Sequence, residues 1–212
     1  MATMVATASS KTLLTTIGNI ADAIPHSEDE QAALKNLLVV STTVLHQALD
    51  LIDNVLTSDD ELTTNSQFLS GSTIGKHLRH ARDHFVILLD SISSPEPHVF
   101  NYDVRTRNTP MESSRKAARE AIGQAIRQLE EVVPRARLDE PMTLNAVTPF
   151  PQVLQTSFGR ELWFAALHAV HHWSMIRVIA GEQGLKLEES FGFAPSTLVY
   201  RGSDAVLGKA NL

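Results

Sequence analysis

The chain has 212 residues, 43% of them hydrophobic, and a formal net charge of −6 at pH 7. The acidic balance leaves no basic surface for nucleic acid, and no apolar run is long enough to cross a bilayer. The absence of cysteine excludes disulfides, a thiol nucleophile and thiolate metal ligands. We therefore expect a cytoplasmic protein with neither nucleic acid nor a membrane as a partner.

The length predicts one domain with a sizeable hydrophobic core. Residues 1–11 are rich in Ala, Ser and Thr and lack an apolar signal core. They predict a disordered tail ahead of a single domain over residues 12–212. Within that domain, residues 12–24 show weak helical spacing.

The first long helix is marked by its capping residues. Ser27, followed by Glu30 three residues later, matches a capping box and predicts a helix that runs to about Thr57. Its apolar positions recur at helical spacing, so one face should enter the core. The polar residues 57–72 then predict a loop over the end of the helices.

A second helix carries three histidines on one face. Ser72 or Thr73 is expected to cap it, and it should close before the next prolines. His77, His80 and His84 stand at positions i, i+3 and i+7, which one helical face presents together. The same face continues as apolar surface, so the histidines should point toward the core.

A long connection follows, over residues 98–112. It carries Tyr102, Arg105 and Arg107, together with acidic neighbours. Long loops with this mixture of side chains often cover a site, and we predict that these three residues bind substrate. The alternative is a solvated crossover with ordinary surface charges.

The next segments alternate between helical and irregular patterns. A third helix is predicted over about residues 112–133, with its apolar positions facing inward. Residues 142–147 favour strand and predict a short hairpin. Residues 191–200 have no helical spacing and should form an ordered loop.

The fourth helix, predicted from about residue 157 to 181, is apolar on nearly every side and should be buried. His168 and His172 stand four apart on it, so both imidazoles lie over one surface spot. Glu161 lies on the same face two turns earlier, whereas His171 is rotated to the side.

These segments predict an all-α fold: a four-helix bundle with long crossover connections. The two histidine-bearing stripes both continue as apolar core surface, so they should pack against each other. Bundles of this kind place metal sites in the core, on side chains from facing helices.

The histidines favour a metal site over a structural core. A single buried imidazole is usually a hydrogen-bonded core residue, but several together cost desolvation and compete for protons. No carboxylate stands among them at a coordinating spacing, so one Zn²⁺, Ni²⁺ or Fe²⁺ ion is expected rather than Mg²⁺ or Ca²⁺. His168 and His172 supply two ligands, and His77, His80 or His84 supplies the third.

The pattern resembles the DinB-like (DinB/YfiT-like) metalloprotein superfamily. The residues that carry the resemblance are the pair His77 and His80 after a helix start, and His168 with His172 on the last long helix. The bundle layout extends it over residues 30–182. The family's helix-two ligand, in the relatives that form ergothioneine sulfoxide, is similar in position to His80. A Gly-Gln that often follows the family's histidine pair is absent here.

The resemblance implies a metal-dependent transferase or hydrolase that acts on a small molecule, with a low-molecular-weight thiol among the candidate partners. Glu161 is the candidate catalytic base, and its alternative role is to interact with the helix N-terminus. Arg105 and Arg107 would bind an anionic group. The competing hypothesis is a metal-binding or stress-response bundle without turnover. A homodimer is compatible with either.

Overall fold

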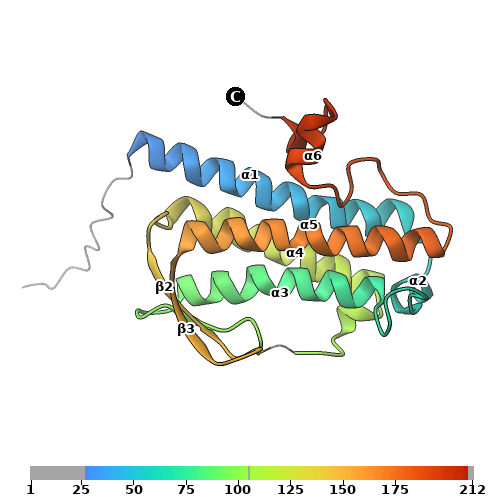
Figure 1. The fold of residues 1–212 in the computed structure, drawn as a ribbon, viewed down its shortest axis with the longest axis horizontal. Coiled ribbons are helices and arrows are strands. Elements are labelled where there is room, and N and C mark those ends of the chain that lie inside the picture. The colour runs from blue at the N-terminus through green and yellow to red at the C-terminus, as the bar shows by residue number, and fades with distance from the viewer. Residues whose placement is uncertain (1–26, 105, 210–212) are drawn as a thin grey trace, which may run out of the picture.

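Four long helices dominate the computed structural model, which describes residues 27–104 and 106–209. They are α1 (Glu28–Asp50), α3 (Ile74–Ser93), α4 (Arg115–Val132) and α5 (Phe158–Glu182). Within this part of the chain, α3 packs against α4 and α5, and α1 packs against the same two helices (Figure 1). The fold is therefore mostly helical, as predicted.

Side-chain caps set where these helices begin. Each is preceded by a Ser or Thr whose hydroxyl accepts a hydrogen bond from the backbone N–H three residues later. Such a cap satisfies one of the four N–H groups that a helix start leaves unpaired. The capping residues are Ser27, Thr73, Ser114 and Ser157. The starts predicted at Ser27 and Ser157 are thus confirmed, and of the two caps predicted for α3, Ser72 or Thr73, the structure has Thr73.

Buried aliphatic and aromatic side chains fill the space between the four helices. Trp173 and Phe158 from α5 and Phe85 from α3 are fully buried. The Trp173 indole N–H donates to the Val44 carbonyl at 2.8 Å, which links α5 to α1 and satisfies a buried donor. Trp173 thus anchors α5 to α1 within this core.

A small sheet corrects the all-α prediction. It contains β1 (Val99–Phe100), β2 (Pro141–Ala146) and β3 (Gln152–Ser157) in the order β1-β2-β3. β2 and β3 form the predicted antiparallel hairpin, with Pro141 opposite Ser157. β1 pairs in parallel with β2 and was not predicted, because a two-residue strand has no readable period.

The remaining short elements also differ from the prediction. A π-helical turn, Leu51–Val55, extends α1, and α2 (Asp60–Thr63) lies in the predicted polar loop. A 3₁₀ turn, Pro110–Glu112, precedes α4, which therefore starts later than predicted. The expected irregular segment ends in α6 (Pro195–Tyr200), because Pro195 sets the first-turn geometry and Leu198 is buried.

The membrane and N-terminal predictions have different outcomes. No helix among the described residues is long and apolar enough to cross a membrane. The predicted tail 1–11 and the weak helix 12–24 lie outside the described residues, as does Arg105.

Candidate metal centre

The histidines of α3 and α5 meet at the interface between the two helices. His77 Nδ1 lies 2.7 Å from His172 Nδ1, and His168 Nε2 lies 3.0 Å from His80 Nε2. His84 packs on His168, with their ring centroids 4.1 Å apart. Two stripes separated by about ninety residues in the sequence therefore form one cluster, as their spacing predicted.

Three Nε2 atoms converge in the middle of this cluster. His168 Nε2 is 3.0 Å from His80 Nε2 and 3.1 Å from His172 Nε2. A ring nitrogen has one proton or one lone pair, so it cannot satisfy both contacts as hydrogen bonds. Nitrogens that share a tetrahedral zinc ion lie about 3.3–3.4 Å apart, given Zn–N lengths of about 2.0–2.1 Å. The arrangement thus fits a divalent ion better than a hydrogen-bonded core.

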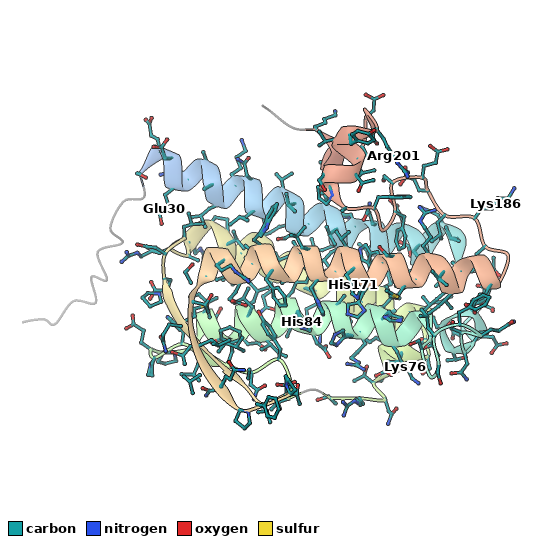
Figure 2. All side chains as sticks on the ribbon, viewed as in Figure 1. Glu30, Lys76, His84, His171, Lys186 and Arg201 are labelled. Atoms are coloured by element: carbon teal, nitrogen blue, oxygen red, sulfur yellow. The ribbon has the colours of Figure 1, made fainter. Side chains whose placement is uncertain are left out.

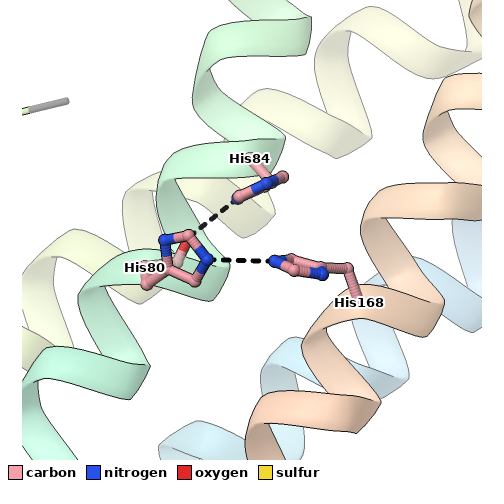
Figure 3. Close-up of side chains that lie close together, drawn as sticks. All are labelled: His80, His84 and His168. Atoms are coloured by element: carbon pink, nitrogen blue, oxygen red, sulfur yellow. Dashed lines mark hydrogen bonds between the residues drawn. The ribbon is translucent and has the colours of Figure 1, made fainter. Parts of the chain in front are cut away.

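His84 also belongs to the cluster. Ligand nitrogens of His80, His84 and His168 all lie within 4.8 Å of one another. Figure 3 shows His84 and His80 on one helix facing His168 on the other. His84 Nδ1 donates to the His80 carbonyl at 3.0 Å, so in the neutral ring Nε2 carries the lone pair. A backbone acceptor of this kind is what fixes the tautomer of a metal-binding histidine.

Burial favours the neutral form of two histidines of the cluster, His77 and His172. It lowers the pKa of His77 to about 4, with His171 as a smaller cause. It also lowers the pKa of His172 to about 2, and the neighbouring imidazoles His80, His168, His77 and His171 add to the effect. Neutral imidazole is the form that binds metals, so these two histidines do not have to lose a proton before a cation binds at neutral pH.

His171 and His77, at the edge of the cluster, differ in burial. Figure 2 shows His171 near the middle of α5. His171 is exposed, as its helical phase predicted. His77 Nε2 is buried and has no hydrogen-bond partner among the described residues. A buried nitrogen without a hydrogen-bond partner is costly in a purely structural core, and its place beside the other ring nitrogens fits a cation site.

Tyr102 and Glu161 form a polar contact beside the histidines. The Tyr102 hydroxyl donates to Glu161 Oε2 at 3.0 Å, and the Thr156 hydroxyl donates to Oε1 at 2.8 Å. Glu161 is buried in the first turn of α5. The Tyr102 ring stacks on His84 with centroids 4.5 Å apart, and burial, followed by the Glu161 charge, raises the Tyr102 pKa. Tyr102 therefore connects the carboxylate to the cluster.

The rest of the connection turns away from the cluster. Asp103 accepts hydrogen bonds from the Val147 and Thr148 backbone N–H groups, which tie it to the β2–β3 turn. Val104 and Thr106 line a cavity of about 380 Å³ between α3 and α4. Arg107 is exposed. Its role as an anion-binding residue stays a prediction, as does that of Arg105.

A larger cavity is lined by two aromatic residues that also contact the histidines. It measures about 680 Å³, and Tyr102 and Phe164 line it while also contacting His84 and His168. Arg160 and Phe164 were not among the residues predicted for the site. Their signal was the spacing of four that places them in one row along α5 with His168 and His172. The full lining is Tyr102, Leu144, Leu154, Gln155, Thr156, Ser157, Arg160, Glu161 and Phe164.

A second group with ligand-type side chains lies near the sheet. Glu96, His98 and Glu140 bring one possible ligand atom each within 4.8 Å of the others. His98 Nδ1 donates to the Ser91 carbonyl at 3.0 Å, and its Nε2 is 3.8 Å from Glu140 Oε1. Glu96 is exposed. This group ties the end of α3 to the start of β2.

The fold and the cluster define a class: a mostly helical protein with imidazoles from two facing helices in a candidate metal site. The chain belongs to the DinB superfamily, whose family model matches residues 40–176. That range contains both histidine stripes, so the resemblance in sequence is confirmed. Family and histidine cluster together support metal binding.

Among curated proteins, the chain is similar to one named FK506-binding protein 5 from Rhizopus delemar, with 35% identity over 159 residues. The match covers 73% of this chain and 35% of that protein. The chain therefore spans about a third of the length of this relative. No solved structure matches the chain.

Proposed function

We propose that this protein is a metal-dependent enzyme, a transferase or hydrolase that acts on a small molecule. One Zn²⁺, Ni²⁺ or Fe²⁺ ion would be held by His80, His168 and His172, with His84 and His77 as the alternatives to His80. The observation that carries the proposal is the convergence of three Nε2 atoms at 3.0 and 3.1 Å. We also infer that the four long helices form the predicted four-helix bundle.

A divalent ion at this position supplies Lewis acidity toward a coordinated water, thiol or substrate oxygen. The chain's own residues supply position and proton transfer. The Tyr102 ring packs on His84 and holds its orientation, while Glu161 holds the Tyr102 hydroxyl. Glu161 is the candidate base, since it lines the cavity where a substrate would lie.

A thiol-dependent reaction is consistent with this site. The chain has no cysteine, so any reacting thiol must come from a small molecule. The cavity beside the histidines, about 680 Å³, is in the size range of small-molecule sites. A low-molecular-weight thiol would therefore reach the cluster through that cavity.

The competing function is a metal-binding bundle without turnover. It is favoured by the number of imidazoles, since His77 and His84 also contact the converging three. A fourth protein ligand would close the coordination shell and leave no position for substrate.

Metal analysis of the purified protein tests the proposal. We expect close to one divalent transition metal per chain, and an open position visible in the absorption spectrum after cobalt substitution. Alanine variants of His77, His80 and His84 should retain metal to sharply different degrees, with His80 retaining least. Equal, mild losses at all three positions, or a closed four-histidine spectrum, would count against the enzyme.

A further inference from the structure

One face of α5 links the cavity to the histidines. Arg160, Phe164, His168 and His172 follow one another at intervals of four residues, so each side chain neighbours the next along a row inclined to the helix axis. The Arg160 guanidinium lies over the Phe164 ring, 5.5 Å from its centroid. Phe164 in turn stacks on His168, with centroids 5.4 Å apart and planes 23° apart. The Arg160 guanidinium therefore contacts the Phe164 ring, and the Phe164 ring contacts the candidate ligand His168.

Tyr102 and Phe164 lie between the cavity and the cluster. Both rings line the cavity, and their centroids are 5.7 Å apart. Each also stacks on a histidine, Tyr102 on His84 and Phe164 on His168. A ligand in the cavity would therefore reach the histidines past two aromatic rings, which favours an apolar body in the ligand.

The cavity offers one cation at its outer end. Arg160 lines it, and 61% of its side chain is exposed. Its Nη1 forms a long ion pair with Glu161 Oε1 at 3.8 Å, a separation beyond hydrogen-bond distance, so its N–H groups are not hydrogen-bonded to that oxygen. Both Glu161 oxygens already accept hydrogen bonds, from Tyr102 and Thr156. The guanidinium can therefore present its N–H groups to an incoming carboxylate, which it binds in a fork geometry.

We propose that this cavity binds the carboxylate end of the substrate, with Arg160 as the residue that recognises it. The inference rests on the proposed function, because the other end of the same molecule would reach the histidine centre. Arg160 and His168 are eight residues apart, which is about 12 Å along the helix. The ligand class is therefore a carboxylic acid with an apolar chain that reaches from Arg160 past Phe164 to the histidines, and with a metal-binding group, such as a thiol, at its other end.

The test has two arms, and the first uses metal-free protein. Calorimetric titration compares octanoate with octanol, which has the same chain without the charge. We expect octanoate to bind more tightly, and Arg160→Ala to weaken it roughly tenfold with little effect on octanol. Arg127→Ala, an exposed arginine on α4, is the matched control. Arg107→Ala tests the alternative anion-binding residue. Equal octanoate affinity in the wild type and Arg160→Ala would overturn the inference.

The second arm uses the cobalt-loaded protein and its thiolate-to-cobalt absorption band. We expect 8-mercaptooctanoate, which spans the cavity, to saturate that band at lower concentration than 3-mercaptopropionate, and to lose the advantage in Arg160→Ala. Equal saturation by the two acids would overturn the inference while leaving the proposed function intact. A cobalt spectrum that no thiol changes would instead overturn the proposed function, and with it the link between cavity and centre.

Discussion

The α3–α5 interface and the connection at residues 98–112 were both expected to contribute to the site, but they differ in outcome. The interface brings together five histidines that helical spacing placed on two stripes. In the connection, Tyr102 reaches the cluster, whereas Arg107 is exposed and Asp103 binds the hairpin. A helix fixes side-chain direction through its period, and an irregular segment has no such rule.

The far end of the connection is held by a buried ion pair that sequence reasoning did not find. Arg79 Nε donates to Glu112 Oε1 at 3.2 Å, and both side chains are buried. A Cβ added at Gly75 would lie 2.0 Å from the Glu112 carbonyl oxygen, so α3 and the connection approach as closely as glycine permits. The contacts that fix this segment therefore come from residues far away in the sequence.

The largest effect should come from removing a histidine of the convergent set. His168→Ala or His172→Ala should lower metal affinity by more than the roughly 10–100-fold typical of losing a residue behind a ligand. Elemental analysis of protein purified without chelator measures the loss. His171→Ala, an exposed neighbour on the same helix, is the control and should retain metal. Wild-type metal content in both variants would show that the interface is structural.

The second prediction concerns the connection. Glu112→Gln removes the negative charge beside the buried Arg79, which keeps its ion pair with Asp83 at 3.5 Å, and should lower the free energy of unfolding by about 2–3 kcal/mol. Urea denaturation measures it, and metal content should not change. Glu120→Gln removes an exposed pair with Lys116 and should change stability by less than about 0.5 kcal/mol. Loss of metal in Glu112→Gln would show that the ion pair in the connection also supports the metal site between α3 and α5.

The third prediction follows from the lowered pKa values of His77, about 4, and His172, about 2. Between about pH 4 and 6.5 the unfolded chain binds protons on these residues and the folded chain does not. Stability of the metal-free protein should therefore rise with pH across this window and fall on acidification. Melting temperatures measured at several pH values in the presence of chelator give the slope.

His172→Asn should reduce that slope because it removes a titrating group that is neutral when folded. His46→Asn, exposed on α1, serves as the matched control. An unchanged slope in His172→Asn would mean that the pKa of His172 is the same in the folded and unfolded chain. That result would contradict the burial of His172 in the cluster.

The smallest effect should come from Tyr102, where the two regions meet. Tyr102→Phe keeps the ring on His84 but removes the donor to the buried Glu161 carboxylate, which should cost about 1–2 kcal/mol of stability. Tyr200→Phe is the matched control, because the Tyr200 side chain is almost fully exposed. Thermal denaturation compares the two variants. Equal melting temperatures would show that the Tyr102 hydroxyl does not stabilise the fold.

The sequence by itself determined the four long helices, the caps of α1, α3 and α5, and the two histidine stripes, because these follow from local chemistry: hydroxyl caps, helical periodicity and the desolvation cost of imidazole. Tertiary structure alone decided the rest. β1 exists because β2 lies beside it, and Asp103 is directed to the hairpin by backbone N–H groups more than forty residues away. The spacing of Arg160 from Phe164 and His168 is visible in the sequence. The cavity beside Arg160 is not, because the hairpin, Tyr102 and α5 form it together. Helical periodicity predicted that the two histidine stripes meet, but the contacts of irregular segments with distant residues leave no such signal and depend on the folded chain.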